Sequence, residues 1–378
     1  MGIEWIFLVL PIVAMVIAKI VYTKEVHWIE AIITVIVIAI LIAAFKSIGT
    51  SFITKDTEYI NNYIQRVEYY EPWDEYISRT CTRQVACGTD SNGNTQYCSE
   101  SYDCSYVEYH SAKWYMVDNQ NISHYIKRNK YIELVNKFST GQKFVDMHRD
   151  YHSYDGDMYY SKYNGEVDKI ETITRKHSYE NRILGSKSVF NYQEIDTSDI
   201  RRYGLYDYPK IINYKQDNIL GNDDKSAEVK LDHLNAKLGK KKQVTVFVLI
   251  YDADKYSQTS IDKQEALWKG GNKNEFIVCI GLSGDSVKWS RVISWNENII
   301  LNIEVRDFIL DKEVLDLNSL IDYMYIKIDS EFKRKSFSDF DYIKVELSDK
   351  QLIILGVIVL ILTIISFVVS IKNELKEN

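Results

Sequence analysis

The chain has 378 residues, of which 46% are hydrophobic and 26% charged, and it contains only three prolines. This composition is that of a folded protein and excludes a long disordered chain. The formal net charge of −7 argues against nucleic acid as a partner, because nucleic acid is bound through clustered basic side chains.

Three segments are almost entirely apolar: residues 5–22, 28–48 and 352–371. About 20 apolar residues in a helix span a hydrocarbon core of about 30 Å, so each segment has the length of a membrane-spanning helix. The residues before Trp5 include no base, which a signal peptide requires. We therefore expect the first helix to be retained, and the chain to be an integral membrane protein.

The positions of the lysines predict the orientation in the membrane. Lys19 and Lys24 lie in the connection between the first two helices, and Lys372 and Lys376 follow the third. The positive-inside rule assigns the connection and the C-terminal tail to the cytoplasm. Three crossings then put the N-terminus and the large block between the second and third helices outside the cytoplasm.

Four of the five cysteines lie in one short segment, at Cys81, Cys87, Cys98 and Cys104. Their spacing is symmetric about Asn92-Gly93, the dipeptide most typical of a two-residue type I′ hairpin turn. With that turn, Cys87 lies opposite Cys98 and Cys81 opposite Cys104. Directly opposed residues are close enough for a disulfide bond, so the spacing favours two nested disulfides.

Other interpretations of the cysteines stay open at this point. Four cysteines allow three connectivities, and a structural zinc site is a further alternative. Zinc sites usually bring cysteines in closer pairs than the spacing here. A dense cluster is typical of disulfides in an oxidising compartment, which agrees with an extracytoplasmic block. The fifth cysteine, Cys279, lies in an apolar run and is expected to be a buried hydrophobic residue.

We divide the chain into two transmembrane helices (1–50), an extracytoplasmic α+β region with the cysteine hairpin (51–220), an α/β module (221–348), and a transmembrane helix with a short cytoplasmic tail (349–378). The fold class is α+β. In the first region we expect a helix at 57–69, the hairpin with a continuation at 106–117, a helix at 123–138 and a strand at 169–176.

The second region alternates between helical and strand patterns. A helix at 226–238 is expected to end at Gly239, a residue that favours helix termination. Continuous apolar runs at 244–251 and 276–282 are typical of strands buried on both faces. With a helix at 261–269, strands at 287–294 and 298–305, and a helix at 317–333, the order α-β-α-β-β-β-α predicts an α/β sandwich.

The segment 266–276, with Trp268, Gly270 and Asn274, and the order of elements around it resemble the TPM-domain proteins over about residues 225–335. The resemblance implies an extracytoplasmic α/β module beside a membrane helix. It also implies either metal binding with phosphatase activity or a role in assembling or modulating membrane complexes. The whole layout is similar to that of uncharacterised membrane proteins of bacteria and their phages.

Two groups of side chains are candidate metal ligands. Asp252 and Asp254 follow a buried strand, where open α/β sheets place ligands, and Asp285 lies on a neighbouring turn. Three carboxylates suit Mg²⁺ or Ca²⁺, although aspartates in loops also form ordinary turns. The second group, which would share one face of a strand and suit zinc or manganese, is Asp146, His148, Asp150 and His152.

No hydrolase elbow, zinc-protease motif or redox Cys-x-x-Cys motif is present in the sequence. We therefore expect a membrane-anchored protein without catalytic activity and without a resident cofactor, whose outer domain binds or assembles protein partners of the envelope or membrane. The alternative is a metal-dependent hydrolase or phosphatase that uses Asp252, Asp254 and Asp285.

Overall fold

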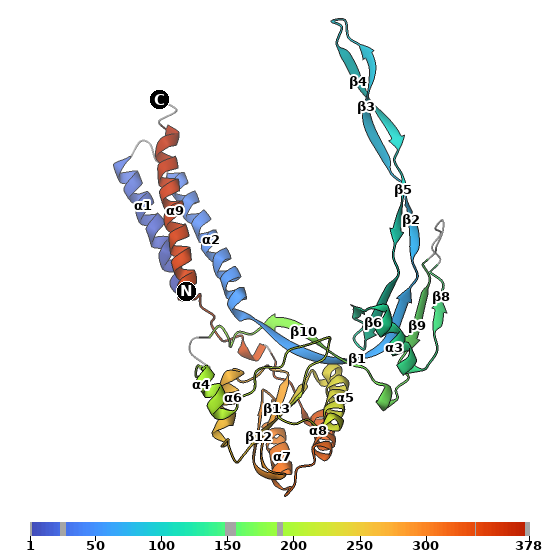
Figure 1. The fold of residues 1–378 in the computed structure, drawn as a ribbon. Helices are drawn as coiled ribbons and strands as arrows, with labels where there is room; N and C mark the ends of the chain where they lie inside the picture. Colours follow the sequence, from blue (N-terminus) through green and yellow to red (C-terminus); the bar gives the residue numbers. More distant parts are fainter. Residues whose placement is uncertain (1, 23–27, 148–155, 187–191, 337, 375–378) are drawn as a thin grey trace.

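A computed structural model describes residues 2–22, 28–147, 156–186, 192–336 and 338–374. Three helical spans are long and apolar enough to cross a membrane, as predicted: Ile3–Val21, Trp28–Thr54 and Asp349–Ser370. The first consists of η1 (Ile3–Leu8) and α1 (Val9–Val21), the second is α2 (Trp28–Thr54), and the third belongs to α9 (Asp349–Glu374). They form one bundle (Figure 1), with Ile38, Ile42 and Leu355 buried between helices.

The strand β1 (Lys55–Tyr70) begins at the residue after α2 ends. The prediction of a helix at 57–69 is therefore wrong. Ile60, Ile64 and Val67 have the spacing of a helix face, which explains the error. A shift of register between Ile64 and Arg66 lets the strand bury both Ile64 and Val67, because a bulge changes which side chains point to a given face.

The two halves of β1 belong to different parts of the structure. Its first half pairs with β10 (Thr172–Glu180), and its second half pairs with β6 (Lys113–Asp118) and β9 (Met158–Lys162), always antiparallel. The second half, β6, β7 (Ser123–Tyr125), β8 (Lys143–Val145), β9 and the helix α3 (Arg128–Phe138) form what we call the arm base. The predicted helix at 123–138 thus begins at Arg128, because its first residues pair with β6.

The second sheet has the order β11-β12-β13-β14. The buried strands β12 (Thr245–Asp252) and β13 (Glu275–Ser283) are parallel, and β14 (Ser286–Ser294) pairs with β13 in the antiparallel sense. β11 (Ile219–Leu220), which lies before the expected boundary at 221, pairs with β12. The remaining elements are η2 (Val167–Lys169), α4 (Thr197–Tyr203), α5 (Lys225–Lys242), α6 (Thr259–Leu267), α7 (Ile299–Leu310), α8 (Leu317–Glu331) and η3 (Ser338–Phe340).

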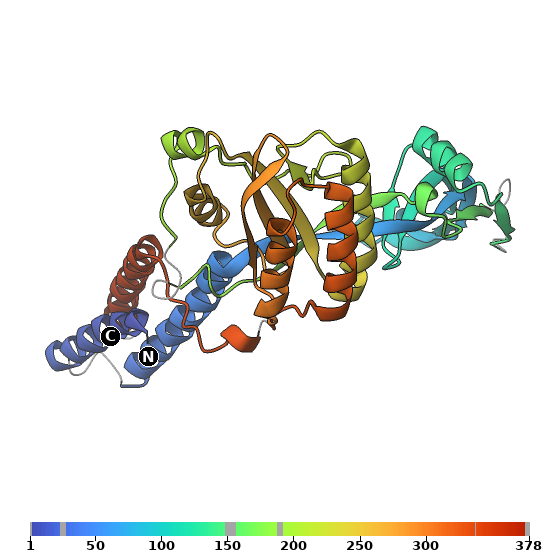
Figure 2. The ribbon, with the colours of Figure 1, turned by 90° about the horizontal axis from the view of Figure 1, so that it is seen from below.

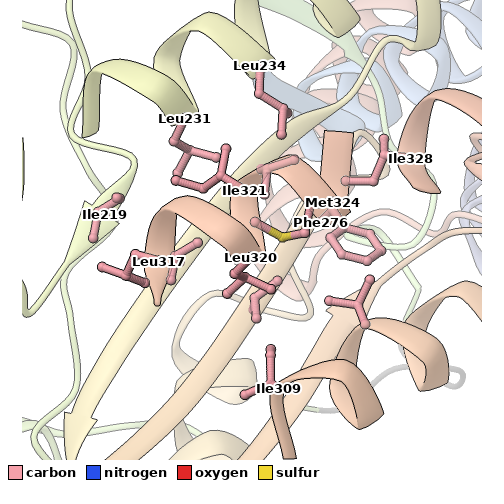
Figure 3. Close-up of a cluster of buried hydrophobic side chains, with 14 of the residues drawn as sticks. Ile219, Leu231, Leu234, Phe276, Ile309, Leu317, Leu320, Ile321, Met324 and Ile328 are labelled. Atoms are coloured by element: carbon pink, nitrogen blue, oxygen red, sulfur yellow. The ribbon is translucent and has the colours of Figure 1, made fainter. Parts of the chain in front are cut away.

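Helices cover both faces of this sheet, and we call β11–β14 with α5–α8 the module. One face packs against α5, α7 and α8 through a large apolar cluster around Leu231, Phe276 and Met324 (Figure 3). The other face packs against α6 and Trp268, and it contains the buried Cys279. A layered α/β arrangement is thus observed, while its relation to TPM domains stays a prediction.

The predicted strand at 298–305 is wrong, because this segment lies within α7. The side chain of Asn298 caps α7 by accepting a hydrogen bond from the Ile300 amide at 3.2 Å. Leu301, Val305 and Ile309 then recur every four residues and are fully buried against the sheet. A run in which nearly every residue is apolar hides this periodicity in the sequence.

Gly239 does not end α5, which continues to Lys242 and terminates at Gln243 in the left-handed conformation (φ 53°). Gly239 is instead buried against β1. A Cβ atom at this position would lie 1.9 Å from the carbonyl oxygen of Asn61. The glycine is required because the helix rests directly on the backbone of the strand.

Replacing Gly239 with alanine should separate α5 from β1 and lower the free energy of unfolding by about 1 to 3 kcal/mol, the usual cost of overpacking. Thermal or denaturant unfolding of the purified protein measures the loss. Gly88→Ala is the matched control, because a Cβ atom at Gly88 meets nothing closer than 3.8 Å. Equal stability of the Gly239 and Gly88 variants would contradict the close packing.

The module lies between the membrane helices and the arm base (Figure 2). From the arm base a long two-stranded projection extends, and it rises from the same side of the molecule as the membrane helices (Figure 1). The projection contains the four clustered cysteines.

Candidate functional site

The candidate site is the projection, residues 73–110, which we call the arm. Its lower part consists of β2 (Trp73–Ile77) paired with β5 (Tyr106–His110), and its outer part of β3 (Thr80–Thr89) paired with β4 (Thr95–Asp103). No second layer covers these strands in Figure 1. Nearly all side chains of β3 and β4 are exposed, so the arm has no hydrophobic core of its own.

Two disulfides brace the outer part of the arm. Cys81 pairs with Cys104 and Cys87 with Cys98, which confirms the nested connectivity. The Cα atoms of the two pairs lie 5.8 Å and 5.7 Å apart, respectively. The first bond lies close to the lower part of the arm and the second lies farther out. Together they hold the ladder at both ends.

The predicted register and turn are wrong in detail. Cys98 faces Val85 rather than Cys87, and the register shifts between Ala86 and Gly88. The disulfides therefore join diagonal neighbours, which are still within reach on one face of a twisted pair of strands.

The turn is longer than the two residues of a type I′ turn. The amide of Asp90 donates to the carbonyl of Asn94 at 2.9 Å, and the amide of Gly93 donates to the carbonyl of Asp90 at 3.0 Å. The Asp90 carboxylate accepts from the amides of Asn92 and Asn94 and so stabilises this loop. Only Gly93 of the predicted pair has a positive φ, whereas type I′ requires both.

Polar pairs across the strands contribute little to the stability of the arm. Arg83 lies 2.9 Å from the Glu100 carboxylate and 5.4 Å from the centre of the Tyr102 ring, and Gln84 donates to Ser99 at 3.0 Å. Exposed ion pairs are usually worth less than about 1 kcal/mol. The two disulfides are consequently the main reason that the arm stays extended.

The arm exposes large aromatic and aliphatic side chains to solvent. The largest exposed fractions are those of Tyr97 (67%), Tyr109 (62%) and Val107 (52%). Two arginines accompany six carboxylates in residues 73–110, which gives this segment a net charge of −4. These tyrosines do not stand out in the sequence, because a strand's own sequence does not say whether another layer covers it.

Removing the outer disulfide should open the arm locally and leave the module folded. Closing the chain over the sequence separation of 11 from Cys87 to Cys98 stabilises the arm by about 3 kcal/mol in the chain-entropy account. We expect the double variant Cys87→Ser with Cys98→Ser to accelerate amide hydrogen exchange in β3 and β4. Cys279→Ala, a change within the module, is the control and should leave exchange in the arm unchanged, and slow exchange in the double variant would contradict the bracing role.

The three candidate aspartates of the module make ordinary turn and surface contacts. Asp252 lies 2.7 Å from the Lys255 ammonium, which lowers the pKa of its carboxyl, and Asp254 accepts from the hydroxyl of Ser283 at 3.0 Å. Asp285 accepts the Leu315 amide through its backbone carbonyl. Among the described residues no three His, Cys, Asp or Glu side chains gather as a metal-binding group.

The second candidate group falls mostly outside the described residues. His148, Asp150 and His152 lie in the segment 148–155, and Asp146 is the one member that the structure describes. Neither candidate group supplies a described ligand set for the metal-dependent hydrolase.

The segment 266–276 makes contacts with β1 and with the chain before β11. The Asn274 amide donates to the carbonyl of Tyr59 at 2.6 Å, and the Trp268 indole donates to the carbonyl of Tyr206 at 2.8 Å. Next to Asn274, Glu275 is fully buried and accepts from Tyr208 and from Asn272. Burial raises the pKa of Glu275. These contacts give the segment 266–276 a structural role.

No protein family, no curated protein and no solved structure matches the chain.

Proposed function

We propose that the chain is an integral membrane protein that presents the arm outside the cytoplasm as a binding surface for another protein of the same membrane. The observation that carries this proposal is the arm itself. A polar, two-stranded projection without a core is held extended by two disulfides and exposes large side chains. Such a structure contributes little to the stability of the module. We therefore assign it a role in binding another molecule.

Two separate features support the proposed compartment and orientation. Disulfides persist in oxidising compartments, which favours an arm outside the cytoplasm. The lysines of the first connection and of the C-terminal tail favour a cytoplasmic position for both segments. If the chain crosses the membrane three times, both features favour an arm and a module that lie outside the cytoplasm.

The direction of the arm supports a partner in the same membrane. The arm and the three membrane helices rise from the same side of the molecule (Figure 1). At about 3.3 Å per residue, the strands from Trp73 to Thr89 extend over roughly 55 Å, whereas a bilayer with its headgroups is about 40 to 45 Å thick. The length of the arm is therefore of the same order as the thickness of the membrane, which supports a partner that is embedded in that membrane.

A polar arm beside a membrane needs a polar environment. Unpaired backbone and charged groups do not enter hydrocarbon without a large cost in free energy, so lipid tails are excluded as the contact. A membrane protein with a basic outer surface meets both requirements, since it neutralises the net charge of −4 and accepts the exposed tyrosines. Tyrosine is enriched among the hot-spot residues of protein interfaces. Complementary charges on two proteins raise the rate of their association and its specificity.

Photo-crosslinking in native membranes tests the partner. Benzoylphenylalanine in place of Tyr97 should yield an adduct with one membrane protein. Ile326 on α8 is equally exposed, at 67%, and serves as the control position, which should not give that adduct. Identical adducts from the two positions, or adducts with lipid alone, would overturn the proposed role of the arm.

The orientation has a separate test in cysteine labelling of intact cells. A membrane-impermeant maleimide should label Lys312→Cys on the module, and it should label Lys376→Cys in the tail only after the membrane is permeabilised. Cys279 is fully buried, so the native chain supplies a low background. The reverse pattern of labelling would show that the module faces the cytoplasm.

A further inference from the structure

A cavity of ≈570 Å³ lies in the arm base, where the arm begins. Glu71 and Pro72, directly before β2, and Ala112, directly before β6, form part of its wall. The cavity is thus separate from the exposed tyrosines of the outer arm. A ligand could occupy it whether or not the outer arm binds a membrane protein.

Aromatic rings from three adjacent strands line this cavity. Tyr69 on β1 is directly opposite Trp114 on β6 and Tyr159 on β9. The Tyr69 ring stacks on Trp114 with 5.6 Å between ring centres, and on Tyr159 with 5.9 Å. Tyr131 of α3 packs against the same ring at 6.1 Å. The row forms a rigid wall, because each ring is fixed by its neighbours across the sheet.

Polar groups accompany the rings. Arg128, the first residue of α3, and Gln142 are exposed and line the cavity with Glu71. The Gln142 amide donates to the Tyr131 hydroxyl at 2.6 Å. Burial and the Glu71 carboxylate raise the pKa of Tyr69, whereas Arg128 lowers it, so both charges act at the Tyr69 hydroxyl. The Tyr69 hydroxyl therefore stays protonated and can donate a hydrogen bond.

This combination selects among ligand classes. Arg128 disfavours a cationic ligand and Glu71 an anionic one. A purely apolar ligand would displace water from the Glu71 carboxylate, the Arg128 guanidinium and the Tyr69 hydroxyl without replacing its hydrogen bonds. A neutral ligand that has both apolar C–H groups and many hydroxyls fits this lining. Its C–H groups can pack against the rings, and its hydroxyls can form hydrogen bonds with Glu71, Arg128 and Gln142. Pockets with apolar walls and a few convergent polar groups are the usual form of small-molecule sites.

We propose that the cavity in the arm base is a binding site for a neutral saccharide. The parts of Trp114, Tyr69 and Tyr159 that line the cavity contact the apolar C–H groups of the sugar. Glu71 and Gln142 accept hydrogen bonds from its hydroxyls, and Arg128 donates to them.

The test uses the full chain in phospholipid nanodiscs, since maltoside detergents carry a sugar headgroup of their own. The probes are chitotetraose and cellotetraose, followed by saturation-transfer NMR and by titration calorimetry. We expect at least one probe to bind. Trp114→Ala and Arg128→Ala should each weaken that binding at least about tenfold, which corresponds to about 1.4 kcal/mol. Arg79→Ala, an exposed arginine outside the cavity, is the control and should not change the affinity.

Trp114 contributes to the packing of the arm base, so its variant can lose binding by unfolding. Arg128→Ala avoids this ambiguity, because the Arg128 side chain lies at the exposed start of α3. Tyr69→Phe keeps the ring and removes one hydroxyl, and it should weaken binding less than Trp114→Ala. The proposal is overturned if neither tetrasaccharide gives saturation transfer at millimolar concentration, or if binding is the same in the Arg128 and Arg79 variants.

Discussion

The part of the protein outside the membrane depends on one strand that two sheets share. β1 continues directly from α2, pairs with β10 along its first half, and forms the centre of the arm base along its second half. The module rests on the same strand through the close contact of Gly239 with Asn61. The second membrane helix therefore continues into β1 without a loop, the module packs against β1, and only two residues separate the end of β1 from the arm. A tilt of α2 would move the whole strand.

The module holds β1 mainly through buried polar contacts. Thr245 donates to the carbonyl of Tyr59 at 2.9 Å and accepts from the Asn61 amide at 3.0 Å. Glu58, fully buried, lies 2.7 Å from the guanidinium of Arg334. Arg334 precedes α9, so this ion pair joins the connections to the second and third membrane helices. Directional contacts of this kind add little net stability but favour one docking orientation, and breaking a buried pair typically costs about 3 to 5 kcal/mol.

Local sequence patterns predicted the elements whose partners are near in the sequence, and also those whose side chains are apolar along their whole length. The three apolar helices, the nested pairing of Cys81 with Cys104 and of Cys87 with Cys98, and the buried strands β12 and β13 are of this kind. The predictions from sequence are wrong where contacts with residues far away in the chain determine the local structure. The helical spacing of Ile64 and Val67 is cancelled by a bulge, and Gly239 serves a contact with a residue far away in the sequence. The direction of the arm and the aromatic cavity at its base also depend on long-range pairing.

The position of β1 in the chain has a consequence for biosynthesis. The strand is made before every strand that pairs with it, since these partners begin at residues 113, 158 and 172. Until then both of its edges are open, and open edges favour aggregation. Before its partners are made, β1 is partly polar because it contains Asn61, Asn62 and Glu68. All three side chains are buried in the final structure. The cysteine pairs close over only 23 and 11 positions, so the arm can finish folding early, whereas the arm base must wait until β9 (Met158–Lys162) has been made.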